Sequence, residues 1–464
     1  AFEYSSGFSE ERMNSYFGRL TYNYKEKYLF EATLRRDGSS VFGEDVRWAT
    51  FPSIAVGWTF SDEKFMKPFY WLSFGKIRAS WGVSGQKFSQ RYLSQGLLSA
   101  NGTTFHGDIA MFPDIRGGVI NKKLSWEETN QYDLGFDLSF LDYRLRLVID
   151  YYYRYTKGQL NQISLPGDIY YHQFQWQNGM AISNQGLELE LEADILRHTA
   201  VKWKMKFNAS RNWNRFEKSY SGKDEDSFII GKPLFNIYLY KDNGYYNSQD
   251  EVPVYYQADG SKKYLMPMFE TQYFTSGDPK VMDVNGDGKV DVFDKSPIGG
   301  TKDPEIVYGF GLNMKYKNLD FGALFQGIGR SWNILGSSII PGANRGVTGN
   351  MFTNANDRWT VDNPSQNVFY PRLDDGINSN NNQSSTWWLR NMSFLRLKNI
   401  ELGYSLPKNL WRNTTVISGI RLFVRGTNLL TFSKFDLWDP EVENTTGAAY
   451  PIMKSLSAGF EIKF

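Results

Sequence analysis

Apolar and polar residues alternate at every second position along much of this chain. Between Tyr143 and Tyr155 every odd position is apolar or aromatic, and most even positions carry a charge. Segments 187–195 and 201–207 repeat the pattern, with acidic residues in the polar positions of the first and lysines in those of the second. A period of two places successive side chains on opposite faces of a β-strand. These segments therefore predict strands with one apolar and one charged face.

Thirteen segments carry this pattern. Strands are expected near 15–24, 28–36, 50–60, 73–83, 127–139, 143–156, 185–195, 201–214, 305–316, 319–327, 394–406, 419–431 and 455–464. Within 394–406 the apolar positions change parity around Lys398 and Asn399, which indicates a β-bulge. The chain is predicted to be all-β.

Short and long connections between these strands alternate strictly. The short ones lie near 25–27, 61–72, 140–142, 196–200, 317–318 and 407–418, and the long ones near 37–49, 84–126, 157–184, 215–304, 328–393 and 432–454. Outer-membrane barrels have short periplasmic turns and long extracellular loops. We therefore predict an antiparallel transmembrane β-barrel, because a soluble β-meander has no reason to alternate in this way.

The segments 187–195 and 201–207 predict a hairpin that turns near His198. This register places Asp194 opposite Lys202, Glu192 opposite Lys204 and Glu190 opposite Lys206. Each such pair stabilises a sheet by roughly 0.2–1 kcal/mol. In a barrel the charged face lines a wet lumen and the apolar face meets lipid.

Composition narrows the function classes. The 464 residues carry 52 Lys and Arg against 50 Asp and Glu, which disfavours a nucleic-acid partner. The absence of Cys excludes disulfides and thiolate chemistry, and no catalytic motif is present, so an enzyme is not expected. Aromatic residues reach 17% although the mean hydropathy is −0.48, which is typical of barrels that turn every second residue to lipid.

A series of motifs then resembles SusC/RagA-type TonB-dependent transporters. They are Tyr28–Ser40, Phe51-Pro52-Ser53 with Gly57-Trp58, Lys76–Gly82 with Ser84-Gly85-Gln86, Gly231-Lys232-Pro233, Asp283–Asp294, Phe394–Asn399 and Thr427-Asn428-Leu429. They follow the order of the family across nearly all of the chain, and this makes the resemblance specific.

The resemblance implies an outer-membrane importer of Bacteroidetes-type bacteria. Family members have a barrel of about 22 strands, an N-terminal plug with a TonB box, and a SusD-like surface lipoprotein that closes as a lid. Residues 1–464 match only the C-terminal barrel part, and neither a plug nor a signal peptide is recognisable. Thirteen is an odd number, and bacterial barrels have even numbers. The chain is therefore expected to begin within a barrel, after about nine further strands of the roughly 22.

The segment 283–294, within a region at 278–300, fits a twelve-position calcium loop with Gly288 at its sixth position. The expected Ca²⁺ ligands are the side chains of Asp283, Asn285, Asp287, Asp291 and Asp294 and the backbone carbonyl of Lys289. The position of Asp294 usually holds Glu. The alternative is a turn rich in Gly, Asn and Asp that its own side chains stabilise.

Aromatic residues in the long connections are candidates for ligand contact. The residues singled out are Tyr170, Tyr171, Trp176, Trp387 and Trp388. Flat aromatic faces suit sugar rings, but aromatics also form interfacial girdles and pack loops together. At the C-terminus, Phe460, Ile462 and Phe464 alternate with polar residues. They resemble the signal that the barrel-assembly machinery reads, although a plain strand end would look the same.

The sequence thus favours TonB-dependent import of oligomeric nutrients, with glycan oligosaccharides ahead of oligopeptides. The expected partners are a SusD-like lipoprotein, the TonB complex through an N-terminal part outside these residues, outer-membrane lipid and the cargo, and no nucleic acid. Two other classes compete: a passive porin and a soluble, secreted glycan-binding protein. The odd strand number and the motifs weigh against the first, and the alternating connections weigh against the second.

Overall fold

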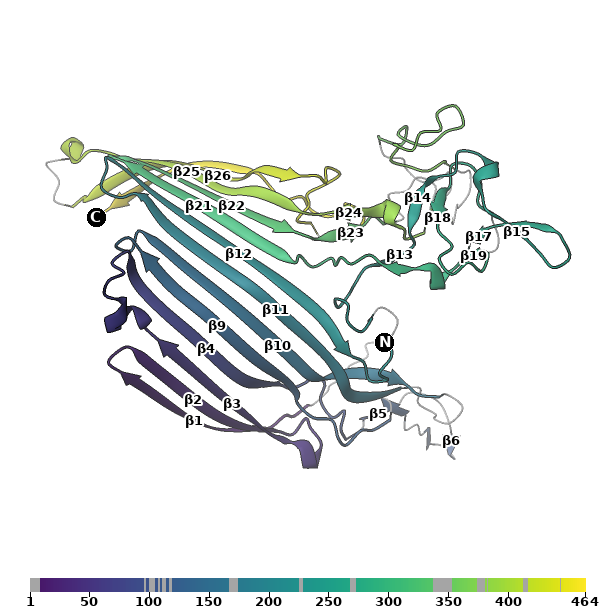
Figure 1. The fold of residues 1–464 in the computed structure, drawn as a ribbon, viewed down its shortest axis with the longest axis horizontal. Coiled ribbons are helices and arrows are strands. Elements are labelled where there is room, and N and C mark those ends of the chain that lie inside the picture. The colour runs from purple at the N-terminus through teal and green to yellow at the C-terminus, as the bar shows by residue number, and fades with distance from the viewer. Residues whose placement is uncertain are drawn as a thin grey trace.

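The computed structural model contains one long, curved, antiparallel sheet with a layer of loops at one end (Figure 1). It describes residues 9–95, 97–99, 105–106, 109–110, 114–116, 119–166, 174–224, 228–267, 273–336, 353–373, 380–381, 383–411, 416–442 and 444–464. In this part of the chain no helix has the length and apolar character needed to cross a membrane.

The sheet has 13 strands, and each pairs with its neighbours in chain order. They are β1 (Met13–Tyr24), β2 (Tyr28–Ser39), β3 (Trp48–Trp58), β4 (Leu72–Gln86), β9 (Glu127–Phe140), β10 (Leu145–Ser164), β11 (Phe174–Leu196), β12 (Val201–Lys218), β21 (Ile306–Tyr316), β22 (Leu319–Gly329), β25 (Phe394–Ser405), β26 (Gly419–Ser433) and β27 (Ser455–Lys463). All thirteen predicted strands are therefore confirmed.

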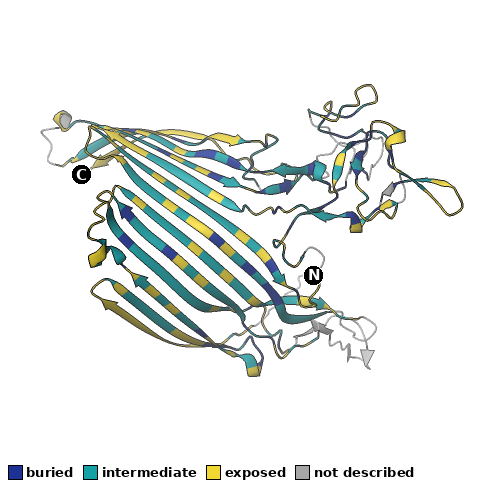
Figure 2. Cartoon of the chain, in the orientation of Figure 1, coloured by how far each residue is buried: buried dark blue, intermediate teal, exposed yellow. Residues whose placement is uncertain are grey.

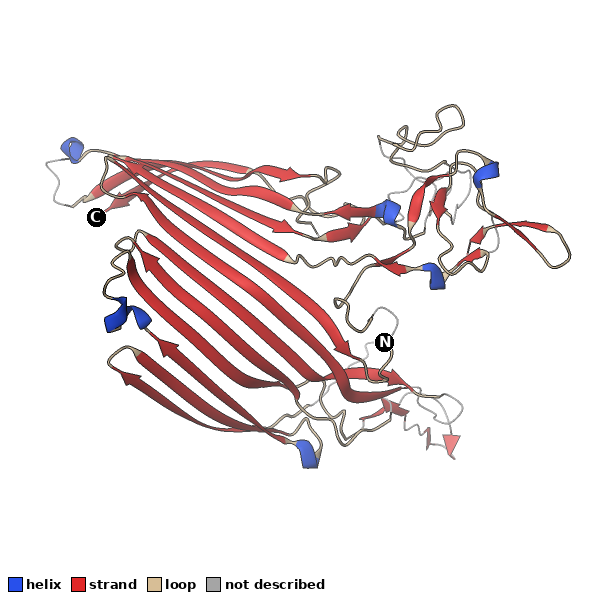
Figure 3. Cartoon of the chain, viewed as in Figure 1, coloured by secondary structure: helices blue, strands red, loops and turns tan. Residues whose placement is uncertain are grey.

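The remaining elements are short and lie in the connections (Figure 3). The strands are β5 (Leu97–Ser99), β6 (Phe105–His106), β7 (Ile109–Ala110), β8 (Asp114–Arg116), β13 (Tyr238–Leu239), β14 (Asp242–Tyr245), β15 (Val254–Tyr256), β16 (Lys262–Tyr264), β17 (Met266–Pro267), β18 (Pro279–Val281), β19 (Lys289–Val290), β20 (Ser296–Pro297), β23 (Trp332–Ile334) and β24 (Leu389–Asn391). The 3-10 helices are η1 (Glu44–Val46), η2 (Phe60–Asp62), η3 (Lys64–Met66), η4 (Gln249–Glu251), η5 (Val292–Asp294), η8 (Thr386–Trp388) and η9 (Lys408–Trp411).

Two details of the predicted strands need correction. The connection expected at 157–184 is mostly strand, because β10 and β11 continue as a paired ribbon as far as Ser164 and Phe174. The hairpin register was wrong by two residues: Glu192 pairs with Lys206, and Asp194 with Lys204. A bulge between Asp194 and Leu196 and a turn that closes on the Leu196–Trp203 pair shift the strands past each other. The predicted bulge at Lys398 is confirmed by register shifts on both sides of β25.

The sheet has two chemically different faces. Register places Leu147 between Leu138 and Leu191, and Ile149 between Phe136 and Leu189, so apolar side chains form a continuous face. This face is open: Tyr151 is 42% exposed and Leu187 is 46% exposed (Figure 2). Water would penalise so much apolar surface, whereas lipid would not. The charged positions share the opposite face.

Short turns lie at one end of the sheet, with the C-terminus, and the long connections lie at the other (Figure 1). The long connections pack into a loop layer with its own apolar clusters. One cluster comprises Tyr240, Tyr246, Val252, Leu265, Phe274, Val281 and Val290, and another comprises Leu335, Tyr370, Trp388, Met392 and Phe435. The second cluster joins the connections 328–393 and 432–454, which follow one another along the chain.

Candidate functional site

The polar face of the sheet carries ion pairs that cross its strands. Arg78 on β4 contacts Asp137 on β9 at 2.8 Å and Asp150 on β10 at 2.9 Å. On the next strands, Lys204 Nζ lies 2.6 Å from Glu192 Oε1, and Lys206 Nζ lies 3.0 Å from Glu192 Oε2. The predicted acid–base ladder therefore forms. The Glu192–Lys204 ion pair is one of those predicted, although it is diagonal in the sheet, and Lys206 is the residue directly opposite Glu192.

A third network joins β22, β25 and β26. Arg421 Nε donates to Asp320 Oδ1 at 3.0 Å, and Arg421 also contacts Glu401 at 2.6 Å. Arg425 pairs with the second oxygen of Glu401 at 2.6 Å. These networks make the polar face a charged but largely neutralised wall, which suits an aqueous lumen.

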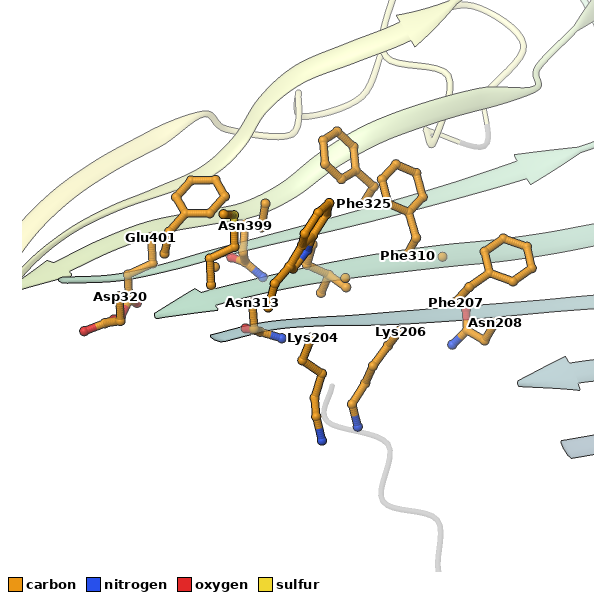
Figure 4. A pocket seen from close by; sticks show the side chains of 18 of the residues that line it. Lys204, Lys206, Phe207, Asn208, Phe310, Asn313, Asp320, Phe325, Asn399 and Glu401 are labelled. Carbon is orange, nitrogen blue, oxygen red and sulfur yellow. The ribbon is translucent and has the colours of Figure 1, made fainter. Parts of the chain in front are cut away.

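A hollow of about 1100 Å³ lies over β12, β21, β22 and β25. Gly309, Gly311 and Gly322 occupy polar-face positions there and contribute no side chains of their own, although Asn208 Oδ1 lies close above Gly309. The lysines and amides around the hollow project to one side of the sheet, and Phe207, Phe310 and Phe325 project to the other (Figure 4). Polar side chains around the hollow include Lys204, Lys206, Asn208, Asn313, Asn399 and Glu401. The hollow can hold a hydrated polar chain or a polar protein segment.

A buried ion pair fastens two long connections of the loop layer together. Arg372 Nε donates to Asp278 Oδ1 at 2.7 Å, and Asn380 Nδ2 and the Thr275 amide donate to Asp278 Oδ2, each at 3.1 Å. Asp278 has no exposed surface. Burial raises the pKa of Asp278, while the neighbouring Arg372 acts in the opposite direction.

A second buried ion group attaches the last connection to the wall. Arg396 on β25 is fully buried and contacts Asp439 and, at 3.3 Å, Glu441. Glu441 also accepts hydrogen bonds from Lys398, the residue at the bulge. Both ion groups join segments far apart in the chain, so no spacing in the sequence indicates them.

Among the predicted ligand-contact aromatics that the structure describes, Trp176 lies apart from Trp387 and Trp388. Tyr170 and Tyr171 lie outside the described residues. Trp176 belongs to β11 and packs against the cluster around Phe42 and Trp126. Trp388 is 1% exposed, and Trp387 packs on Tyr245 with 4.3 Å between ring centroids. Trp388 belongs to the core of the loop layer and the partly buried Trp387 packs beside it, and contact of either with a ligand stays a prediction.

The 283–294 loop closes on its own hydrogen bonds. Asp283 accepts bonds from the amides of Gly286 and Gly288 and from the Tyr255 hydroxyl at 2.8 Å. Asp294 accepts bonds from the amides of Val284, Asn285 and Asp291. Burial works against ionisation of Asp283, but the bond from Tyr255 and the amide bonds outweigh it and lower the pKa of Asp283. Burial and the bond to Asp283 raise the pKa of Tyr255 to about 12.

Calcium therefore has suitable donors in this loop but no preformed cage. A carboxylate oxygen that accepts one hydrogen bond from a backbone amide keeps a second lone pair, which can face a cation. Asn285 Oδ1 and Asp287 Oδ1 accept bonds from the amides of Asp287 and Lys289, and Asp291 Oδ1 accepts one from Phe293. Among the described residues, no group of three or more His, Cys, Asp or Glu side chains is arranged to hold a metal ion. Calcium binding stays a prediction.

The C-terminal strand forms as predicted. Phe460 and Ile462 lie opposite Leu422 and Ile420 on the apolar face. Phe460 is 70% exposed and Phe464 is 83% exposed. Recognition of these residues by an assembly machinery stays a prediction.

Comparisons with known proteins identify relatives of this chain. Residues 2–429 match the family described as TonB dependent receptor-like, beta-barrel. The TonB-dependent receptor P26 of Formosa agariphila is 29% identical over 486 residues, which cover 99% of this chain and 47% of the relative. The TonB-dependent receptor SusC of Bacteroides thetaiotaomicron is 29% identical over 466 residues, which cover 97% and 43%.

Solved structures agree with the sequence comparison. The RagAB peptide transporter superposes with a TM-score of 0.78 at 27% identity, covering 98% of this chain and 48% of that one. The chain thus spans about half the length of the relatives that it matches. The resemblance to SusC/RagA-type transporters is confirmed, together with the all-β barrel architecture. The chain belongs to the TonB-dependent receptor-like β-barrel family of the bacterial outer membrane.

Proposed function

We propose that this chain is the C-terminal barrel part of a TonB-dependent importer of oligomeric nutrients. The observation that carries the proposal is the continuous charged face of the 13-stranded sheet, opposite an open apolar face, in a chain of this family. The charged face would keep the transport path wet, and the loop layer would meet cargo at the outer mouth.

The proposed mechanism needs parts outside these residues. A plug blocks the lumen, and a SusD-like surface lipoprotein closes over the loop layer after cargo has bound. TonB, energised from the inner membrane, displaces the plug, and cargo then moves along the polar wall. The hollow over β12, β21, β22 and β25 offers space for that passage.

Oligosaccharides are the cargo we favour. The polar wall combines amides with neutralised ion pairs and so suits hydroxyl-rich neutral ligands. Oligopeptides are the second candidate, and the similarity to a peptide transporter supports them. A passive pore would need neither TonB nor a lid.

The test is uptake by cells that express the complete receptor and its lipoprotein. Labelled neutral oligosaccharides and labelled oligopeptides are supplied in parallel, with and without functional TonB. We expect saturable uptake of an oligosaccharide that disappears without TonB. Uptake that persists without TonB would identify a passive pore, and uptake of peptides alone would reassign the cargo.

A further inference from the structure

A small hollow lies at the outer end of the polar face, where β11 and β12 meet the loop layer. It measures about 200 Å³, and its lining includes Asn184, Asn212, Asn214, Phe235, Asp303 and Glu305. Drug-sized ligands occupy sites of roughly 300–1,000 Å³, so this hollow suits a single ring. Its position puts it beside any cargo that passes from the loops into the lumen.

Phe235 supplies an aromatic surface held in an unusual backbone conformation. It is the third residue of a turn that the Asn236 amide closes on the Pro233 carbonyl at 3.2 Å. Its φ is 55°, in the region where such turns favour glycine. Even so, its side chain is 60% exposed. The ring meets Phe228 edge-on, with 5.8 Å between the ring centroids, and most of its remaining surface stays open to a ligand.

The wall beside Phe235 fixes the turn and orients polar groups. The Leu234 amide donates to Asn214 Oδ1 at 2.7 Å, which ties the turn to β12. Asn214 Nδ2 donates to Asn184 Oδ1 at 2.8 Å, so the acceptor of Asn184 is engaged. Within the described residues, neither the Asn184 amide nitrogen nor the Asp303 carboxylate has a hydrogen-bond partner. The hollow thus offers one donor and one acceptor beside an aromatic ring.

The charge of the hollow favours a neutral ligand over an amine. The Glu305 carboxylate lies 2.6 Å from Arg330 and 3.6 Å from Arg211, so these arginines neutralise it. Asp303 then stands as a hydrogen-bond acceptor in a wall with little net negative charge. A peptide amine would gain little there, whereas a hydroxyl pair can receive a bond from Asn184 and donate one to Asp303.

We propose that this hollow is a subsite for one sugar ring of a neutral oligosaccharide. The C–H face of the ring would stack on Phe235, and its hydroxyls would bond to Asn184 and Asp303. The subsite deepens the proposed function and rests on it for the cargo class.

The test uses the complete receptor with its lipoprotein, purified in detergent. Titration calorimetry measures binding of malto-, cello-, xylo- and fructo-oligosaccharides. Phe235→Gly removes the ring while suiting the positive φ, so the turn is preserved. Phe235→Trp keeps an aromatic face, and Asp303→Asn removes the carboxylate. Tyr256→Gly is the control, because Tyr256 is 76% exposed on β15, outside the hollow.

We expect Phe235→Gly to weaken binding of the preferred oligosaccharide about tenfold, in line with stacking energies. Asp303→Asn should weaken it several-fold, while Phe235→Trp and Tyr256→Gly stay near wild type. If the wild type imports an oligosaccharide and all variants bind it equally, the subsite is overturned and the proposed function stands. If the wild type imports none, the proposed cargo fails. In that case, if an oligosaccharide still binds the purified receptor and Phe235→Gly weakens this binding, the subsite is retained. If no oligosaccharide binds, the subsite is overturned as well.

Discussion

Lys204 donates a 2.6 Å hydrogen bond to Glu192, although the residue directly opposite Lys204 in the sheet is Asp194. Glu192 thereby forms ion pairs with both Lys204 and Lys206 and links these two lysines of β12. Replacing Glu192 with Gln removes both ion pairs while keeping the shape of the side chain. We expect a loss of about 0.5–1 kcal/mol in unfolding free energy, typical of partly exposed pairs.

The measurement is urea unfolding of the receptor in detergent, and Glu190→Gln is the matched control. Glu190 lies on the same face and strand, and no ion pair is recorded for it among the described residues. Equal effects of the two substitutions would show that Glu192 has no special role in the wall.

A second prediction concerns which face meets lipid. Leu189 belongs to the apolar face and Glu190 to the polar face of the same strand. Leu189→Lys should cost about 2–4 kcal/mol if it lies near the bilayer midplane. Glu190→Lys should cost far less, because its side chain stays in water. Heat-modifiable migration of outer-membrane fractions reports the folded amount of each variant, and a larger loss for Glu190→Lys would reverse the assignment of the faces.

The ion pair between Arg372 and Asp278 yields a pH-dependent prediction. Arg372→Ala leaves the buried carboxylate without its cation, which should destabilise the loop layer by about 3–5 kcal/mol at neutral pH. Burial already raises the pKa of Asp278 in the folded protein. The Asp278 carboxyl group therefore stabilises the folded state most in acid, and this stabilisation is lost as the pH rises through the folded-state pKa. Without Arg372 the pKa of Asp278 rises further. The loss of stability in the variant should therefore become smaller as the pH falls towards about 4, near the pKa of an aspartate in an unfolded chain.

Hydrogen exchange of segments 273–281 and 365–373 at neutral and acid pH measures this effect. Arg358→Ala is the control, because within the described residues the hydrogen bonds that Arg358 donates go to Ala355 and Asn356, in its own segment. If Arg372→Ala reduces protection from exchange equally at both pH values, the charge of Asp278 does not determine the stability of the loop layer.

The sequence predicted the strands well because the sheet is a single layer with one apolar face. Each strand must then alternate along its length, and the bulge at Lys398 was visible as a change of parity. The register of the Glu192–Lys204 hairpin was missed, because opposite charges two residues apart satisfy each other in either register.

The candidate site was less predictable. Trp387 and Trp388 have the composition of ligand contacts, yet the loop layer uses them as its own core. The turn at Phe235 gave no signal, because a large aromatic residue rarely adopts a positive φ and the side chain that ties the turn to the sheet, Asn214, belongs to another segment. Contacts between distant loops, such as Asp278 with Arg372, follow from packing and leave no periodic pattern.

The last prediction tests calcium in the 283–294 loop. If Ca²⁺ turns the oxygens of Asp283, Asn285 and Asp287 inward, calcium should protect the amides of this loop from hydrogen exchange and raise its thermal stability. Asp287→Ala removes one ligand and should abolish the response, whereas Asp259→Ala should keep it, because Asp259 lies at the exposed tip between β15 and β16. Exchange is followed with excess calcium and with a chelator. Identical protection in both would show that the amide bonds to Asp283 and Asp294 suffice to hold the loop without a metal.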